Sequence, residues 1–149
     1  MSPDFKEILS IFNARKVKYL IVGAHAVMKY SEPRYTKDLD IWVEASEENA
    51  KSVYAALREF GAPLGKLAES DFASDGFFQM GRPPVRIDIL MSIDGVNFSD
   101  AWPMKLEGDF DGIPAHFIDR ENLIVNKTAS GRPQDIIDID SLKTPRLKL

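Results

Sequence analysis

Hydrophobic and polar positions alternate between a helical and an extended period along the first part of the chain. Ser2 precedes a run of apolar residues at helical spacing, which predicts an N-capped helix that ends near Ala14. A β-rich apolar run over residues 18–22 then ends at Gly23, and a second helix is expected over residues 24–30. The chain is therefore predicted to open with a helix, a strand, a glycine turn and another helix.

The next segment repeats the order of strand and helix. Residues 39–43 form a second apolar run and predict a strand. Ser46 then opens a helix that Gly61 closes, because serine is a common N-cap and glycine a common C-cap. The pattern over residues 65–74 is weak and indicates a loop or a short irregular helix.

The second half of the chain is predicted to hold further strands and a helical end. Two strands are expected over residues 77–80 and 85–90, with a hairpin connection at Gly81–Pro84. Two short strands over residues 104–106 and 115–118 are expected to be joined across Asp111–Gly112. A helix capped by Asp119 and a last helix from Pro133 to Leu142 complete the chain. This order predicts an α/β (α+β) fold, a mixed β-sheet flanked by helices with a helical C-terminal element.

Composition limits the class of protein. A length of 149 residues, with 44% hydrophobic and 28% charged residues, is typical of one globular domain over residues 1–149. No apolar run is long enough for a membrane span, so a cytoplasmic location is expected. A net charge of −4 disfavours a protein that coats nucleic acid. Because the chain has no cysteine, any metal must bind oxygen or histidine.

Two aspartates interrupt the second predicted strand. Asp38 and Asp40 are two residues apart, so both side chains should lie on the same face of the strand. Two carboxylates so near to each other repel unless a cation lies between them, and Mg²⁺ prefers such oxygen ligands. Asp88, in the apolar run over residues 85–90, is a third candidate. If the two strands are neighbours, the three carboxylates converge on a metal site.

The glycine turn supplies a second kind of site. Gly23 and Ala24 place backbone amides at the start of a predicted helix. Free amides and the helix dipole both favour a phosphate group at such a position. Gly23 also lets the backbone approach a neighbouring group closely.

Four stretches together resemble the minimal and abortive-infection-toxin-like nucleotidyltransferases of the DNA polymerase beta superfamily. They are Tyr19–Ala26, Arg34–Ile41, Ile87–Leu90 and Asn126–Asp138, and the resemblance covers roughly residues 17–142. It implies transfer of a nucleoside monophosphate from a nucleoside triphosphate to a hydroxyl acceptor with release of pyrophosphate. It further implies a Mg²⁺ cofactor, with a two-ion site and with Mn²⁺ as a substitute.

The resemblance also implies roles for single residues. Asp38 and Asp40 would hold the metals, while Asp88 would share one metal and act as the base for the acceptor hydroxyl. Five residues would bind the nucleotide. Gly23 and Ala24 would hold the triphosphate, and Lys127 would neutralise it. Arg34 and Thr36 would brace the acidic strand or contact phosphate.

Several alternatives remain open. The acceptor could be a protein, an RNA or a small hydroxylated molecule, and a partner protein is expected if the chain belongs to a toxin–antitoxin pair. Ala24 replaces the serine that is usual after this glycine in the superfamily, or the glycine that is common in this branch, so a hydroxyl that could contact phosphate is missing. A non-catalytic module that binds a nucleotide or a partner is therefore the second hypothesis. A phosphoesterase is the third, although the chain has only 2 histidines.

The remaining polar and aromatic candidates are expected to be structural. His25 is expected to be packed rather than to contact phosphate, and His116 has no ligand partner at a suitable spacing. Arg132 and Asp135 are expected to pair and to hold the last helix against the sheet. The aromatic residues of the β-rich runs and their surroundings are expected in the core rather than stacked on a base: Trp42, Phe77, Phe78, Phe98 and Trp102.

Overall fold

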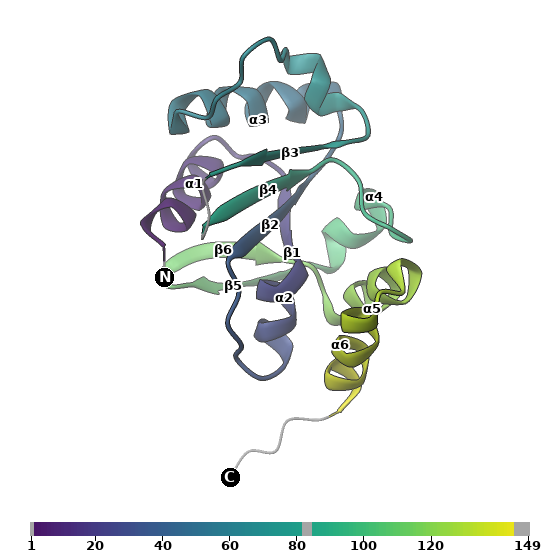
Figure 1. The fold of residues 1–149 in the computed structure, drawn as a ribbon. Helices are drawn as coiled ribbons and strands as arrows, with labels where there is room; N and C mark the ends of the chain where they lie inside the picture. Colours follow the sequence, from purple (N-terminus) through teal and green to yellow (C-terminus); the bar gives the residue numbers. More distant parts are fainter. Residues whose placement is uncertain (1, 82–84, 145–149) are drawn as a thin grey trace.

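A six-stranded mixed sheet forms the centre of the computed structural model, which describes residues 2–81 and 85–144 (Figure 1). Its strands are β1 (Tyr19–Val22), β2 (Asp38–Val43), β3 (Phe77–Met80), β4 (Arg86–Leu90), β5 (Leu106–Phe110) and β6 (Ile113–Phe117). Their order across the sheet is β3-β4-β2-β1-β6-β5. β2 runs parallel to β4, and β1 runs parallel to β6, while the other neighbours are antiparallel.

Helices cover both faces of the sheet, as Figure 1 shows. They are α1 (Pro3–Ala14), α2 (Gly23–Tyr30), α3 (Glu47–Phe60), α4 (Phe98–Ala101), α5 (Arg120–Ser130) and α6 (Pro133–Lys143), with two short 3-10 helices, η1 (Glu69–Ala73) and η2 (Trp102–Met104). The predicted mixed sheet flanked by helices, with a helical C-terminal element, is thus confirmed.

Alternate residues of β1 enter two separate hydrophobic cores. Tyr19 and Ile21 pack in the core beneath α1 and α3. Leu20 and Val22 point to the other face and pack in a core that includes residues of α2 and the C-terminal helices. Because all four β1 residues are buried, this strand appears in the sequence as a continuous apolar run.

The sequence signals for the helix ends act as predicted. The Ser2 hydroxyl accepts a hydrogen bond from the amide of Asp4 at 3.2 Å, and the Ser46 hydroxyl accepts one from the amide of Asn49 at 3.1 Å. Gly61 ends α3 in the left-handed conformation with φ of 92°. These caps fix the boundaries of α1 and α3.

One prediction for the middle of the chain is wrong, and another lies partly outside the described residues. Met104 belongs to η2 rather than to a strand, because Pro103 favours the start of a helical turn over strand pairing. The following strand accordingly begins at Leu106. The predicted hairpin connection Gly81–Pro84 lies partly outside the described residues, although β3 and β4 do pair antiparallel.

Phe77 is the exception among the aromatic residues expected in the core. Trp42 is buried, and Phe78, Phe98 and Trp102 are half-buried, whereas Phe77 is 64% exposed. The prediction fails because β3 is an edge strand on which no more than one face is covered, so its alternate side chains face outward.

No helix within the described ranges is long and apolar enough to cross a membrane.

Candidate active site

The pairing of β2 with β4 brings the predicted carboxylates together. The parallel register places Asp40 directly opposite Asp88 and Asp38 opposite Arg86. Paired residues on neighbouring strands project from the same face, and the carboxyl groups of Asp40 and Asp88 are within hydrogen-bonding reach. The three aspartates therefore lie on one face of two adjacent strands.

Burial and mutual repulsion perturb this acid pair. Burial, together with the charge of Asp88, raises the pKa of Asp40 from 3.8 to about 7. Burial also raises the pKa of Asp88, although the guanidinium of Arg86 opposes that shift. Two neighbouring carboxyl groups with raised pKa values hold a proton near neutral pH unless a cation replaces it.

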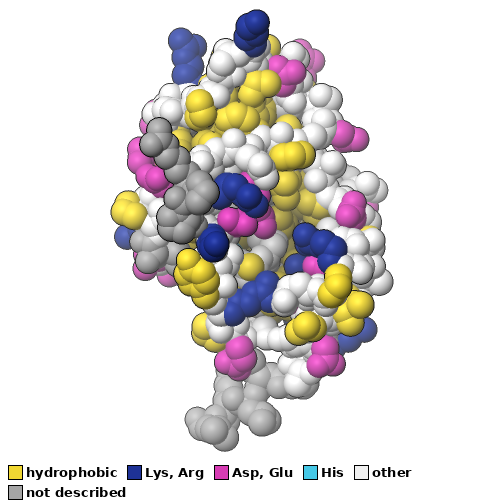
Figure 2. All heavy atoms as spheres, in the orientation of Figure 1, with side chains coloured by type: hydrophobic (Ala, Val, Ile, Leu, Met, Phe, Trp, Pro, Cys, Tyr) yellow, Lys and Arg dark blue, Asp and Glu magenta, His cyan; other side chains and the backbone are white. Residues whose placement is uncertain are grey.

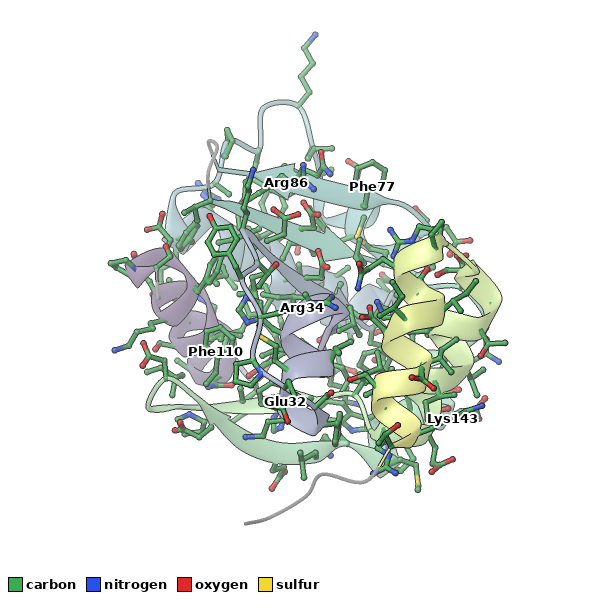
Figure 3. All side chains as sticks on the ribbon, turned by 60° about the horizontal axis from the view of Figure 1, so that its bottom comes forward. Glu32, Arg34, Phe77, Arg86, Phe110 and Lys143 are labelled. Atoms are coloured by element: carbon green, nitrogen blue, oxygen red, sulfur yellow. The ribbon has the colours of Figure 1, made fainter. Side chains whose placement is uncertain are left out.

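Arg86 provides a cation at this site, a feature that the sequence analysis missed. Its Nη2 donates to Oδ2 of Asp38 at 3.1 Å, and its Nε lies 3.2 Å from Oδ1 of Asp88. The guanidinium thus links two carboxylates of the trio, and Figure 3 shows Arg86 on the outer part of the sheet. A charged residue two positions before Asp88 on the same strand is the sequence signal that could have identified it.

The donor set suits a hard divalent cation. Within the described residues, Oδ1 of Asp88 is buried and makes no hydrogen bond; its contact with Nε of Arg86 at 3.2 Å is an ion pair that a metal ion could replace. Carboxylate oxygens on β2 and β4 are the ligands that Mg²⁺ prefers. No three acidic or histidine side chains of the described ranges are grouped closely enough to hold a metal ion, and Arg86 contacts both Asp38 and Asp88. Metal binding by all three would require that guanidinium to move.

Gly23 allows Asp40 to lie against the start of α2. A Cβ built on Gly23 would lie 2.2 Å from Oδ2 of Asp40, and the residue has φ of +67°. The register supports this contact, because Val22 pairs with Asp40 across β1 and β2. No side chain of the described residues caps the first turn of α2, so the amides that begin at Gly23 and Ala24 remain available to an anion.

We expect Gly23→Ala to displace Asp40 and to impair both stability and activity. The methyl group would clash with the carboxylate, and alanine is strained at a positive φ, so the free energy of unfolding should fall by about 2 kcal/mol or more. Gly61→Ala is the matched control, because Gly61 has φ of +92° but no atom within 4 Å of the added Cβ. Thermal unfolding of both variants measures the difference. Equal losses would show that the contact with Asp40 contributes nothing.

The C-terminal helices carry a buried network of charges beside the acids. Nζ of Lys127 on α5 lies 3.1 Å from Asp135 and 3.1 Å from Asp138, both on α6. Lys127, Asp135 and Asp138 are 5%, 0% and 1% exposed. Arg132 adds a hydrogen bond from its Nε to Asp135 at 2.9 Å. The Arg132–Asp135 pair is therefore present as expected, but it belongs to a larger network.

Hydrogen bonds keep the two carboxylates of this network ionised. Burial by itself would raise the pKa of Asp135, but donors on Arg132, Ser130 and Lys127 hold it below its usual range. The pKa of Asp138 is lowered in the same way, by Arg34 among others, against the effect of burial.

Arg34 and Thr36 lie on the segment that leads into β2. Arg34 forms an ion pair with Asp138 and thereby connects this segment to α6. The Thr36 hydroxyl accepts a hydrogen bond from the amide of Asp38 at 3.3 Å, which braces the start of the acidic strand. Of the two residues, Thr36 thus contacts the acidic strand, whereas Arg34 contacts the helical element.

Two adjoining cavities open at the acids, and Figure 2 shows acidic and basic side chains side by side at this hollow. One cavity has a volume of about 480 Å³ and lies between α2, the start of β2 and α6. The other has a volume of about 330 Å³ and lies between the end of β4 and α5. Both are lined by Gly23, Asp40, Lys127 and Arg132.

The two histidines pack against aromatic side chains. His25 is 8% exposed and packs against Phe5 and Phe110, with ring centroids 5.7 and 5.0 Å apart. Burial lowers its pKa to about 4, so the imidazole is neutral at physiological pH. His116 packs against Tyr19 and Trp102. The expectation that His25 is packed is confirmed.

The fold is similar to those of several solved nucleotidyltransferases. ANT(2'')-Ia in complex with adenylyl-2''-tobramycin matches with a TM-score of 0.62 and 17% identity, over 93% of this chain and 84% of that one. The lincosamide antibiotic adenylyltransferase LnuA, bound to lincomycin, matches with a TM-score of 0.57 and 17% identity, over 98% of each chain. An antigenic nucleotidyltransferase-like protein from Paracoccidioides brasiliensis matches with a TM-score of 0.55 and 16% identity, over 93% and 73%.

Sequence comparison identifies the family. The comparison with curated proteins gives no match. The model of a family described as "Nucleotidyltransferase of unknown function (DUF6036)" matches residues 4–144, which is most of the chain. The protein therefore belongs to this family of nucleotidyltransferases.

Proposed function

We propose that the protein transfers a nucleoside monophosphate from a nucleoside triphosphate to a hydroxyl group, with Mg²⁺ or Mn²⁺ as cofactor. One observation carries this proposal: Asp38, Asp40 and Asp88 lie on one face of adjacent strands, and Asp40 contacts the uncapped start of α2 at Gly23. Carboxylates for a metal and free amides for a phosphate are thereby adjacent, as transfer from a metal-bound triphosphate requires.

The nucleotide would lie over α2 and the C-terminal helices. The amides of Gly23 and Ala24 would receive the phosphates, because this helix start has no side-chain cap within the described residues. Lys127 borders the larger cavity and uses its ammonium for Asp135 and Asp138, which leaves one of three N–H donors for a phosphate oxygen. Arg34 also borders this cavity and supports it through its ion pair with Asp138.

Asp38, Asp40 and Asp88 would hold the divalent cation. When bound, the cation would polarise the phosphoryl oxygens and neutralise the leaving pyrophosphate. The raised pKa of Asp40 supports this assignment, because a bound cation would offset both of its main causes, the burial of the carboxylate and the repulsion from Asp88.

Asp88 would act as the base towards the acceptor. In the reaction the acceptor oxygen forms a bond to the α-phosphorus, the bond between the α- and β-phosphates breaks, and pyrophosphate leaves. The acceptor proton passes to the carboxylate of Asp88, which lies directly opposite Asp40 on the neighbouring strand. Arg86, whose Nε lies 3.2 Å from Oδ1 of Asp88, would move away from this carboxylate when the cation binds.

A module that binds nucleotide without turnover is the second candidate. Two features favour it: Ala24 has no hydroxyl for phosphate, and Arg86 already neutralises Asp38 and Asp88. A part in a toxin–antitoxin pair, as one half of a complex with a partner protein, is compatible with either candidate. The two candidates differ in whether pyrophosphate is released.

Transfer can be tested with α-labelled nucleoside triphosphates, Mg²⁺, and protein, RNA and small-molecule fractions as acceptors. We expect a labelled acceptor and an equal amount of pyrophosphate, and we expect Asp88→Asn to abolish transfer while nucleotide still binds. Nucleotide binding without pyrophosphate release from any fraction would favour the binding module. Release of free monophosphate without a labelled acceptor would indicate a phosphoesterase.

A further inference from the structure

The direction of attack determines where the acceptor binds. In phosphoryl transfer, the attacking and leaving oxygens lie in line on opposite sides of the phosphorus. On the proposed function, the leaving pyrophosphate lies at the amides of Gly23, at the end of β1. The sheet order β3-β4-β2-β1 then places the acceptor on the other side of β2, above β4 and β3.

The surface at this position is partly apolar and exposed. Phe77 pairs with Leu90 and Gln79 pairs with Asp88, so all four side chains share one face of β3 and β4. Phe77 is 64% exposed, Gln79 is exposed and Leu90 is half-buried. Figure 3 shows Phe77 on this outer strand. An aromatic ring and an amide thus lie one strand away from the proposed base, and we name these residues, Phe77, Gln79 and Leu90, the β3 platform.

Among the residues that the structure describes, the charges around the β3 platform do not favour a polyanion. Arg86 is paired with Asp38 and Asp88, and Lys127 is paired with two carboxylates of α6. Asp94, which is exposed, lines the smaller cavity together with Leu90. Phosphate groups of an RNA would meet cations that are already neutralised, and an exposed carboxylate, so electrostatics favour an uncharged or cationic acceptor.

We propose that the acceptor is a small molecule with a hydroxylated ring, a neutral sugar or an aminosugar, bound on the β3 platform. The C–H face of the ring would pack on Phe77 and Leu90, because an apolar surface orients a ligand whose polar groups point away from it. A ring hydroxyl would then face Asp88, and the Gln79 amide would donate to or accept from the adjacent hydroxyl. This assignment rests on the proposed nucleotidyl transfer, and it makes Phe77 a specificity-determining residue.

The test uses backbone amide NMR of the whole chain saturated with Mg²⁺ and the α,β-methylene analogue of ATP or GTP. Four probes are titrated: maltose as a neutral sugar, tobramycin as a cationic sugar, a dodecameric RNA, and a peptide with serine and tyrosine hydroxyls. We expect one or both sugars to shift the amides of residues 76–79 and 90. Phe77→Ala should weaken that sugar about tenfold. Met104→Ala is the control, because Met104 is 59% exposed and lies outside both cavities.

The outcomes separate this proposal from the proposed function. Shifts of the amides of Gly23 and Ala24 by the nucleotide analogue report nucleotide binding alone. If these shifts occur but neither sugar affects residues 76–79, the acceptor assignment is wrong while nucleotide binding stands. Preferential shifts of the β3 platform by the RNA or the peptide, or equal affinity of the sugar for the wild type and Phe77→Ala, would also overturn it.

Discussion

Asp40→Asn should abolish nucleotidyl transfer and, in the absence of divalent metal, raise the melting temperature of the protein. On the proposed role of Asp40 as a metal ligand, the activity should fall at least about 1,000-fold, because such a carboxylate contributes several kcal/mol to transition-state stabilisation. The opposite effect on stability follows from the raised pKa of Asp40, about 7, which burial and the charge of Asp88 cause. Asparagine keeps the shape and removes the charge, so the repulsion disappears.

The pH dependence of stability gives the sign of this effect. Between pH 4 and 7, folded Asp40 binds a proton that the unfolded chain has released, so the free energy of unfolding falls as the pH rises through this window. At pH 8 the metal-free wild type has lost this contribution. We therefore expect Asp40→Asn to be more stable than the wild type by about 2 kcal/mol, or about 5 °C, at pH 8 and by less at pH 5.

Thermal unfolding in a metal chelator at pH 5 and pH 8 measures the effect, with Asp140→Asn as the control. Asp140 is exposed on α6, so its replacement should leave both melting temperatures unchanged. Saturation with Mg²⁺ and a triphosphate analogue should stabilise the wild type more than Asp40→Asn. A lower melting temperature of metal-free Asp40→Asn at pH 8 would show that the acid pair is not strained.

The candidate site was predictable from sequence as far as it depends on local periodicity. Asp38 and Asp40 share a face because strand side chains alternate, and Gly23 marks a close backbone approach; the structure agrees on both points. That Asp88 lies directly opposite Asp40 depends on the pairing of two strands separated along the chain. From the sequence, the meeting of the three carboxylates could be predicted only on the condition that the two strands are neighbours. The contact of Arg86 with Asp38 and Asp88 likewise depends on that strand register.

The last helix shows why burial on α6 could not be inferred from residue type. Ile136 and Ile137 are each 63% exposed, whereas Asp135 and Asp138 are buried. The usual rule that apolar residues face inward is inverted because Lys127 compensates both carboxylates. A sequence does not show which charged residue of another helix lies beside a carboxylate, so buried and exposed charged residues look alike in the sequence.

Phe77 was wrongly predicted to be buried, because a short apolar run does not show whether its strand lies at the edge of the sheet.

The buried network makes Lys127→Met the substitution with the largest expected effect on folding. Methionine has a similar length and fills the space of the lysine side chain, but it leaves Asp135 and Asp138 ionised and buried without their shared cation. Removal of one partner from a buried ion pair costs about 3–5 kcal/mol. The free energy of unfolding, measured in urea, should fall by this amount.

Arg132→Ala is the matched control, because it removes a second cation from the same carboxylate. The Arg132 side chain is 73% exposed, so water can replace it, and the loss should stay below about 1 kcal/mol. Where Lys127→Met does not fold, the triple variant Lys127→Met/Asp135→Asn/Asp138→Asn removes the unpaired charges and should recover most of the stability. Equal losses for Lys127→Met and Arg132→Ala would contradict this explanation.

Because Asp138 also pairs with Arg34, the triple variant should release the segment before β2 and weaken nucleotide binding even after stability returns.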